Sequence, residues 1–309
     1  MNDFSKMIIK EFEIRKSRKQ KDVFLDKVCR RLDELEYTYQ IQETKGLLKS
    51  RNLIVGDIKQ AKVIFTAHYD TCATMFFLPN FITPLNKKVY YAYQFLISFG
   101  LIASAMAIGI LLDIVTNSII PASFGYTVCL FGFFFQLMFG YRNPKNYNDN
   151  TSGVVTLLEL LESVEDREKV AFIFFDNEEK GLLGSGAFRA KYASKVVDKV
   201  LINFDCVGEG DTLFMKYNKS MHEAKVKDIF EESCVSSEDK KFLFTNKGLY
   251  PSDQKHFDKI CHTVAVAALK SSKWVGLYMN RIHTPKDTCL DESNVDLLKK
   301  SMLAFLKEI

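Results

Sequence analysis

One long apolar segment interrupts an otherwise charge-rich sequence. Residues 89–141 contain a single charged side chain, Asp113. The uncharged runs on either side of it, 89–112 and 114–141, hold 24 and 28 residues. A helix rises about 1.5 Å per residue, so 24 residues reach roughly 36 Å, which exceeds the ~30 Å hydrocarbon layer of a bilayer. The segment therefore predicts a hairpin of two membrane-spanning helices, joined at residues 113–118.

The residues that flank this hairpin predict its orientation. Aromatic and basic side chains gather at its two outer ends: Tyr90, Tyr91, Tyr93, Tyr141, Lys87, Lys88, Arg142 and Lys145. The connection between the spans contains no Lys or Arg. Because segments rich in Lys and Arg stay in the cytoplasm, both chain ends are expected there. A soluble apolar lid or a dimerisation contact is the alternative, since Pro121, Gln136 and several glycines weaken the second span.

The charge and the cysteine content narrow the class of protein. The net charge of +4 is too small to predict nucleic-acid binding. A basic run at residues 15–21 is mixed with acidic residues, so we interpret it as the solvated face of a helix. The seven cysteines are odd in number and include no Cys-x-x-Cys pair, which favours free thiols and a reducing compartment. The first residues carry charges without an apolar core, so no signal peptide is expected.

Outside the hairpin, the hydrophobic pattern predicts an α/β fold. Residues 1 to about 45 are expected to be helical, with apolar side chains at helical spacing from Phe24 to Leu32. Four largely apolar runs predict buried strands: residues 61–67, 170–175, 199–204 and 262–269. Strands of this kind are covered by helices on both faces. A further helix is expected in the following chain, capped by Thr151 or Ser152.

Polar residues follow three of these four runs. They are His68, the pair Glu178 and Glu179, and Asp205. The carboxyl ends of parallel strands form the edge at which open α/β sheets bind ligands. Adjacent carboxylates repel, and burying such a pair without cations is unfavourable, so the two glutamates predict a metal site. Asp70 is two residues beyond His68 and points the same way, so it is expected to hold the second ring nitrogen of that histidine.

Two further residues complete a candidate ligand set. Asp149 precedes the predicted helix, where it either caps the helix or bridges two metal ions. His283 lies in an Ile-His-Thr-Pro loop, which by itself predicts only a surface histidine. Together, the two imidazoles and three of the carboxylates are able to hold two Zn²⁺ ions, and the remaining glutamate is able to act as a base. The other two histidines on regular elements, His222 and His262, are interpreted as structural.

The order of these motifs resembles that of a known family, the co-catalytic zinc aminopeptidases of metallopeptidase family 28. The motifs are His-x-Asp from His68, Asp-Asn-x-Ser-Gly from Asp149, Glu-Glu-x-Gly-Leu-x-Gly-Ser from Glu178, and then Asp205 and His283. That family also includes some carboxypeptidases and the glutaminyl cyclases. The resemblance covers roughly residues 50–80 and 142–309. It implies a three-layer α/β/α zinc-hydrolase sandwich with a mixed, mostly parallel sheet.

The resemblance also implies a role for each residue. The ligands of one zinc ion are expected to be His68, Asp149 and Asp205, and those of the other Asp149, Glu179 and His283. Glu178 is expected to be the general base that moves a proton from water to the leaving amine, with Asp70 supporting His68. The two zinc ions are expected to lower the pKa of the attacking water and to polarise the scissile carbonyl.

The substrate pocket departs from the family pattern. The family usually has Ser-Asp-His-x-x-Phe, whereas this chain has Gln254 in place of that histidine. We expect the neighbouring Asp253 and His256 to lie near the pocket. The residue before the last metal histidine is Ile282, where secreted members often have a tyrosine, so Tyr250 becomes the candidate oxyanion donor.

The sequence therefore predicts a zinc-dependent aminopeptidase at the cytoplasmic face of the cell membrane. Residues 1–79 and 142–309 are expected to form the catalytic domain, and 80–141 the inserted hairpin, whose residues 89–141 contact the lipid bilayer. The hairpin leaves the domain between two predicted ligands, which favours apolar or membrane-associated peptides as substrates. The alternatives are a glutaminyl-cyclase-like enzyme with a single zinc ion and a membrane-bound non-catalytic pseudoenzyme. Oligomerisation is left open.

Overall fold

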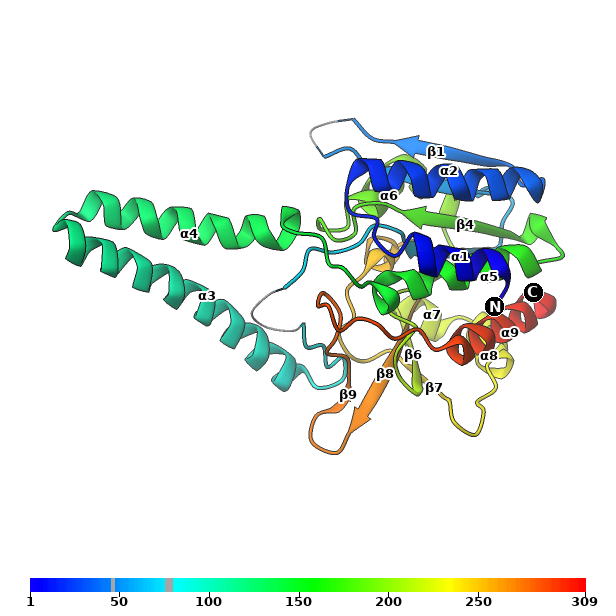
Figure 1. Ribbon diagram of the computed structural model, residues 1–309. Coiled ribbons are helices and arrows are strands. Elements are labelled where there is room, and N and C mark those ends of the chain that lie inside the picture. Colours follow the sequence, from blue (N-terminus) through cyan, green and yellow to red (C-terminus); the bar gives the residue numbers. More distant parts are fainter. Residues whose placement is uncertain (46–47, 76–79) are drawn as a thin grey trace.

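The computed structural model describes residues 1–45, 48–75 and 80–309. An α/β body carries a hairpin of two long helices that projects from one edge, and both chain termini lie at the opposite end (Figure 1). The helices are α1 (Asp3–Glu11), α2 (Arg18–Glu34), α3 (Lys87–Thr116), α4 (Ile119–Phe139), α5 (Gly153–Ser163), α6 (Leu183–Val196), α7 (Lys219–Glu223), α8 (Val226–Ser233) and α9 (Glu292–Glu308). Three short helical segments are η1 (Tyr147–Ser152), η2 (Arg167–Lys169) and η3 (Asp253–Phe257).

Within the described ranges, nine strands form one mixed sheet. They are β1 (Tyr39–Glu43), β2 (Arg51–Val55), β3 (Val63–His68), β4 (Val170–Phe175), β5 (Val200–Phe204), β6 (Thr212–Tyr217), β7 (Lys241–Thr245), β8 (His262–Ser272) and β9 (Gly276–Tyr278). Their order is β1-β2-β4-β3-β5-β8-β6-β7, with β9 paired to β8. The four central strands, β4, β3, β5 and β8, are parallel to one another. Their carboxyl ends therefore share one edge of the sheet.

The central strands are buried on both faces, because helices cover the sheet on each side. Every residue of β3, β4 and β5 is buried. Alternate side chains enter different cores: Phe172 and Phe174 of β4 pack with the side of α1, α2, α5 and α9, whereas Ile173 and Phe175 pack with the side of α6. This arrangement explains the largely apolar runs, and it confirms the prediction of an α/β fold with an inserted helical hairpin.

The first 45 residues are only partly helical. The prediction of helices over residues 1 to about 45 was therefore wrong for the last part of this range. Helix α2 begins at a capping box in which Ser17 and Gln20 bond reciprocally. The chain then turns at Glu36, whose φ is 57°, and Tyr39–Glu43 runs antiparallel to β2 as an edge strand. Only one residue of strand β1, Gln42, is buried, so the strand lacks the apolar run that identifies the central strands.

The cap of α5 also differs from the prediction. The side chain of Asn150 accepts from the backbone N–H of Gly153 at 3.1 Å, which is the role that Thr151 or Ser152 was expected to fill. The hydroxyl of Ser152 instead donates to the carbonyl of Asn148 at 2.7 Å and accepts from the backbone N–H of Val207 at 2.9 Å. Ser152 therefore ties the start of α5 to the chain that follows β5.

The hairpin consists of α3 and α4, both long and apolar enough to cross a membrane. The connection is shorter than predicted, because α3 continues through Asp113 to Thr116 and only Asn117 and Ser118 join the helices. Asn117 adopts a left-handed conformation with φ 48°, which is typical of a helix C-terminus. Large apolar side chains cover the outside of both helices, among them Ile114 at 74% exposure. Residue 79, at which the first part of the catalytic domain is predicted to end, lies outside the described ranges.

Candidate metal centre

The predicted site residues meet at the carboxyl edge of the central strands. His68 is the last residue of β3, the two glutamates follow β4, and Asp205 follows β5. Asp149 lies in η1, directly before α5, and His283 lies in the loop between β9 and α9. Segments far apart in the sequence thus bring two histidines and four carboxylates to one place, beside the base of the hairpin (Figure 1).

Asp149 lies between the two histidines. Its Oδ1 is 3.4 Å from Nε2 of His68, and its Oδ2 is 3.0 Å from Nε2 of His283. The same nitrogen of His68 is 3.7 Å from Oδ1 of Asp205, and that of His283 is 3.3 Å from Oε2 of Glu179. Two groups of ligand atoms therefore share one carboxylate, with each oxygen of Asp149 facing a different group.

The site concentrates buried negative charge. Burial, together with the charges of Glu179 and Asp205, raises the pKa of Glu178 well above its ordinary value, although His68 opposes this. Burial, with the charge of Asp149, raises the pKa of Glu179 to about 8. Oε1 of Glu179 is buried and has no hydrogen-bond partner among the described residues. Buried carboxylates packed this closely are unfavourable without cations, so the donor set fits divalent metal ions with oxygen and nitrogen ligands.

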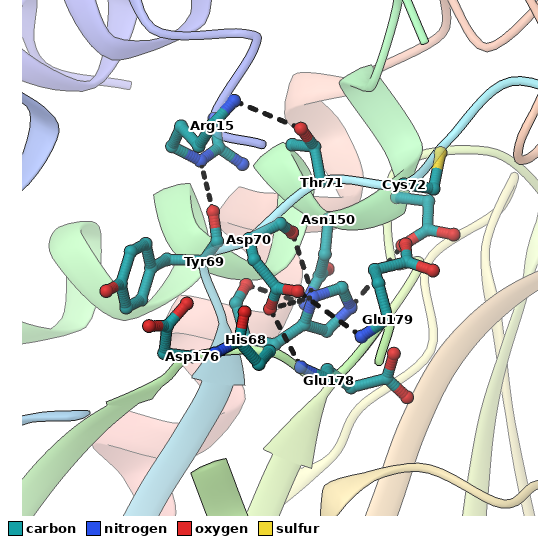
Figure 2. Close-up of polar contacts among 12 residues, drawn as sticks. Arg15, His68, Tyr69, Asp70, Thr71, Cys72, Asn150, Asp176, Glu178 and Glu179 are labelled. Carbon is teal, nitrogen blue, oxygen red and sulfur yellow. Dashed lines mark hydrogen bonds and ion pairs between the residues drawn. The ribbon is translucent and has the colours of Figure 1, made fainter. Parts of the chain in front are cut away.

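Asp70 connects the first histidine to both glutamates, as Figure 2 shows. Nδ1 of His68 is 3.6 Å from Oδ1 of Asp70 and 3.1 Å from its backbone oxygen. The carboxylate accepts from the backbone N–H of Glu178 at 2.9 Å and from that of Glu179 at 3.3 Å. One buried side chain thus orients a ring and fixes the turn that carries the glutamate pair.

Two cations predicted to be solvated are buried beneath the site. Arg15 is fully buried and donates from Nε to the backbone oxygen of Tyr69 at 2.5 Å (Figure 2). Its Nη1 donates to Oγ1 of Thr151 at 3.1 Å. Lys21, at 4% exposure, pairs with the buried Asp176. The interpretation of residues 15–21 as a solvated face was therefore wrong for these two residues. Their positive charges offset part of the negative charge of the neighbouring carboxylates.

The sequence reasoning missed Asp287, which supports the bridging aspartate. Its carboxylate accepts from the backbone N–H of Asn148 at 2.8 Å and from that of Asp149 at 3.0 Å. Burial, with the nearby charge of Asp149, raises the pKa of Asp287 to about 8. Its position four residues after His283, in the same loop, was the only signal in the sequence.

Cys72 lies close to the predicted site residues in the sequence, but its sulfur was not predicted to lie among the ligand atoms. Its sulfur lies within reach of the ligand atoms of Glu179 and His283. The thiol donates to Oδ1 of Asn146 at 3.3 Å, and the side chain is buried. Burial raises the pKa of this thiol well above its ordinary value. All seven cysteines of the chain are free in the structure, as the sequence predicted.

The three predicted pocket residues lie in different surroundings. Tyr250 lines the pocket, but its hydroxyl already donates to the backbone oxygen of Asp205 at 2.9 Å. Asp253 is fully buried in η3, and burial raises its pKa to about 7. His256 does not appear among the described residues that line the pocket, and its ring lies against Gly186 of α6. The structure therefore brings one of the three to the pocket.

A pocket of about 300 Å³ opens over the ligand groups. Its lining includes Glu178, Pro251 and Ile282. The hairpin contributes Tyr90 and Gln94 of α3 to the same lining. The first turns of the hairpin are thus part of the pocket wall.

Comparisons with known proteins agree with this architecture. The structure resembles a glutaminyl cyclase of Porphyromonas gingivalis, with a TM-score of 0.64 and 18% identity over 99% of this chain and 96% of that one. It also resembles the LapA aminopeptidase of Legionella pneumophila, with a TM-score of 0.58 and 15% identity over 99% and 68% of the two chains. A glutaminyl cyclase of Macrostomum lignano gives a TM-score of 0.61 and 12% identity over 99% and 88%.

At the sequence level, no curated protein matches the chain. At these identities the structural likenesses establish the shared fold alone. The family model of Peptidase family M28 matches residues 142–307, which is more than half of the sequence. The chain therefore belongs to peptidase family M28.

Proposed function

We propose that this protein is a zinc-dependent aminopeptidase that removes N-terminal residues from peptides at the cytoplasmic face of a membrane. Membership of a peptidase family supports the hydrolase, and zinc is the metal expected in that family. The observation that carries the proposal is the position of Asp149, with one oxygen facing each of two ligand groups. A bridging carboxylate in this position fits two metal ions better than one.

The two ligand groups differ in composition. His68, Asp149 and Asp205 would hold one zinc ion, and Asp149, Glu179 and His283 the other. The unpaired buried oxygen of Glu179 supports this assignment, because a carboxylate oxygen without a partner is unfavourable in a buried site. When bound, the metal ions lower the pKa of a coordinated water and polarise the scissile carbonyl.

Glu178 is the proposed general base. Its side chain lines the pocket but belongs to neither ligand group, so its carboxylate remains available to exchange a proton with the reacting groups. The backbone N–H of Glu178 donates to Asp70, which fixes the turn and hence the direction of the side chain. A glutamate held beside the ligands is able to accept the proton of the attacking water and return it to the leaving amine.

The hairpin is proposed to anchor the enzyme in the bilayer. We propose that residues 1–79 and 142–309 form the catalytic domain and that residues 80–141 are the insertion. Large exposed apolar side chains on both helices and the basic residues Lys87, Lys88 and Arg142 at their base support this organisation. The orientation with the catalytic body in the cytoplasm follows from the positions of these basic residues.

Metal content and turnover test the function together. Full-length protein in detergent, loaded with zinc, is expected to bind two zinc ions and to hydrolyse leucine amide. Glu178→Gln should keep both zinc ions. Its turnover rate should fall by a factor of about 10²–10⁴, because the amide cannot accept the proton. Glu165→Gln, at an exposed position, is the matched control and should change neither value.

Three results would overturn the proposal. Near-normal turnover in Glu178→Gln would remove the assigned base. One bound zinc ion, with cyclisation of an N-terminal glutaminyl peptide and no release of leucine, would establish the cyclase alternative. Two zinc ions with neither activity would favour the non-catalytic alternative.

A further inference from the structure

A second cavity, of about 350 Å³, lies between the two helices of the hairpin. Two side chains, Asn80 and Gln94, line both this cavity and the catalytic pocket. The two spaces are therefore neighbours that share these two residues, and the cavity lies next to the metal centre.

The lining of the inter-helix cavity is mainly apolar. One wall is a single face of α3, formed by Gln94, Ile97, Ser98, Leu101 and Ile102 at helical spacing. The other wall comes from α4, with Leu130, Phe133, Phe134, Gln136 and Leu137. None of the described lining residues is charged. The cavity therefore suits an apolar occupant.

Small residues near the tip explain why the helices diverge. A methyl group at Gly109 would lie 3.2 Å from the backbone oxygen of Ala122, so the helices are in close contact there. Gly125 lies against the side chain of Leu112 in the same way. Toward the body the facing residues are large, and Figure 1 shows α3 and α4 spreading apart in that direction. The space between them is thus set by the sequence of the hairpin.

The dimensions fit a short stretch of peptide. Gln94 and Ile102 are eight residues apart on α3, so the cavity follows the helix for about 12 Å at ~1.5 Å per residue. An extended peptide covers about 3.3 Å per residue, so roughly four residues span this length. A single side chain in the catalytic pocket is too short to fill it.

We propose that this cavity binds the apolar residues that follow the scissile bond of the substrate. The substrates are then apolar peptides that reach the site from the lipid phase, with the N-terminal residue at the metal centre and the following residues between α3 and α4. The inference rests on the proposed aminopeptidase function and adds its substrate class.

The polar groups of the lining favour a peptide over a lipid chain. Asn80 and Gln94 present amide side chains where the two spaces meet, and amides pair with the backbone N–H and C=O groups of a peptide. On α4, in the turn next to the body, Gln136 donates to the backbone oxygen of Thr74 at 3.3 Å, and its side-chain oxygen is an acceptor. An acyl chain has no groups that pair with these amides, whereas the peptide backbone within an apolar medium requires such partners.

A peptide series on the zinc-loaded, full-length protein in lipid nanodiscs tests the inference. Two pentapeptides are compared, and both begin with leucine. The remaining four residues are leucine and alanine in the apolar peptide, and serine and glutamine in the polar peptide. The wild type is expected to give a kcat/KM at least tenfold higher for the apolar peptide. Leu101→Trp fills the cavity and should reduce this ratio at least tenfold, whereas Leu96→Trp, the same change on the lipid-facing side, should leave the ratio unchanged.

Photo-crosslinking separates this inference from the proposed function. An apolar pentapeptide with benzoylphenylalanine at its fourth position, bound to Glu178→Gln, is expected to label residues 94–102 or 130–137. Labelling confined to other parts of the chain, or a wild-type ratio near one, would overturn the inference even if leucine amide is hydrolysed. Labelling within the hairpin without hydrolysis of any peptide would support the cavity and overturn the aminopeptidase. A similar fall of the ratio in Leu96→Trp would also count against the inference.

Discussion

Removal of Asp287 should weaken metal binding without any direct contact between this residue and the proposed metal ions. The carboxylate of Asp287 accepts from the backbone N–H groups of Asn148 and Asp149, at 2.8 and 3.0 Å. These two bonds fix the backbone that carries the bridging carboxylate. In Asp287→Ala both N–H groups lose their acceptor inside a buried site, so the segment is free to shift and the bridge loses its position.

The magnitude follows from the two unpaired donors. A buried N–H without an acceptor costs about 1–3 kcal/mol, so the pair costs about 2–6 kcal/mol. The lower half of this range is expected, because burial and Asp149 already raise the pKa of Asp287 to about 8, and the variant no longer buries that carboxyl. With roughly 2–4 °C per kcal/mol, a loss of about 2–4 kcal/mol lowers Tm by about 4–16 °C. Loss of a residue that orients a metal ligand typically reduces metal affinity about 10- to 100-fold.

Two measurements test this prediction: thermal unfolding of the metal-free protein and zinc titration against a fluorescent chelator. The matched control is Asp291→Ala, four residues further along. Asp291 caps α9 and bonds Lys240, so its loss should cost about 1 kcal/mol. This control should leave zinc affinity unchanged. If Asp287→Ala binds zinc as tightly as the wild type, the proposed support of the bridging carboxylate is refuted.

Three further predictions concern the ligands, the hairpin and the glutamate turn. Asp149→Ala should lose more than one zinc equivalent by metal analysis, whereas His283→Ala should mainly empty one site, and equal losses would contradict the bridge. A single reporter cysteine at Asn117 should be labelled from outside intact cells and one at Lys145 should not, and the reverse pattern would refute the topology. Gly184→Ala would press a methyl group against the backbone oxygen that follows β4, so Tm should fall with a cost of about 1–3 kcal/mol, and an unchanged Tm would contradict the close approach.

The central strands were predictable because their burial on both faces produces a local pattern in the sequence. The apolar run 170–175 coincides with β4, since a strand covered on both faces requires an apolar residue at every position. Strand β1 shows no such pattern, because only Gln42 of this edge strand is buried and its exposed positions tolerate polar residues. The extent of α3 was also underestimated, because Asp113 was read as part of a turn although a charge near a helix end does not stop the helix.

Some residues of the site were predictable from the sequence and others were not. Each proposed ligand follows an apolar run or sits in a recognisable motif, so its type and order could be read from the chain. The roles of Asp287 and Arg15 could not be predicted from the sequence. Asp287 accepts from a backbone N–H group of another segment, and Arg15 is buried against residues distant in the sequence. Cys72 belongs to the same class, since only the folded chain brings its sulfur near Glu179.

The sequence by itself determined the α/β class, the apolar hairpin and the ligand candidates, because apolar periodicity and residue chemistry are local properties. Only the tertiary structure decided that Asp149 turns one oxygen toward each histidine, since that depends on where η1 lies relative to the ends of β3 and the loop before α9. It also decided that the first turns of α3 line the catalytic pocket and that a cavity continues between the helices. Such spaces arise from the angle between packed elements, and no stretch of sequence specifies that angle alone.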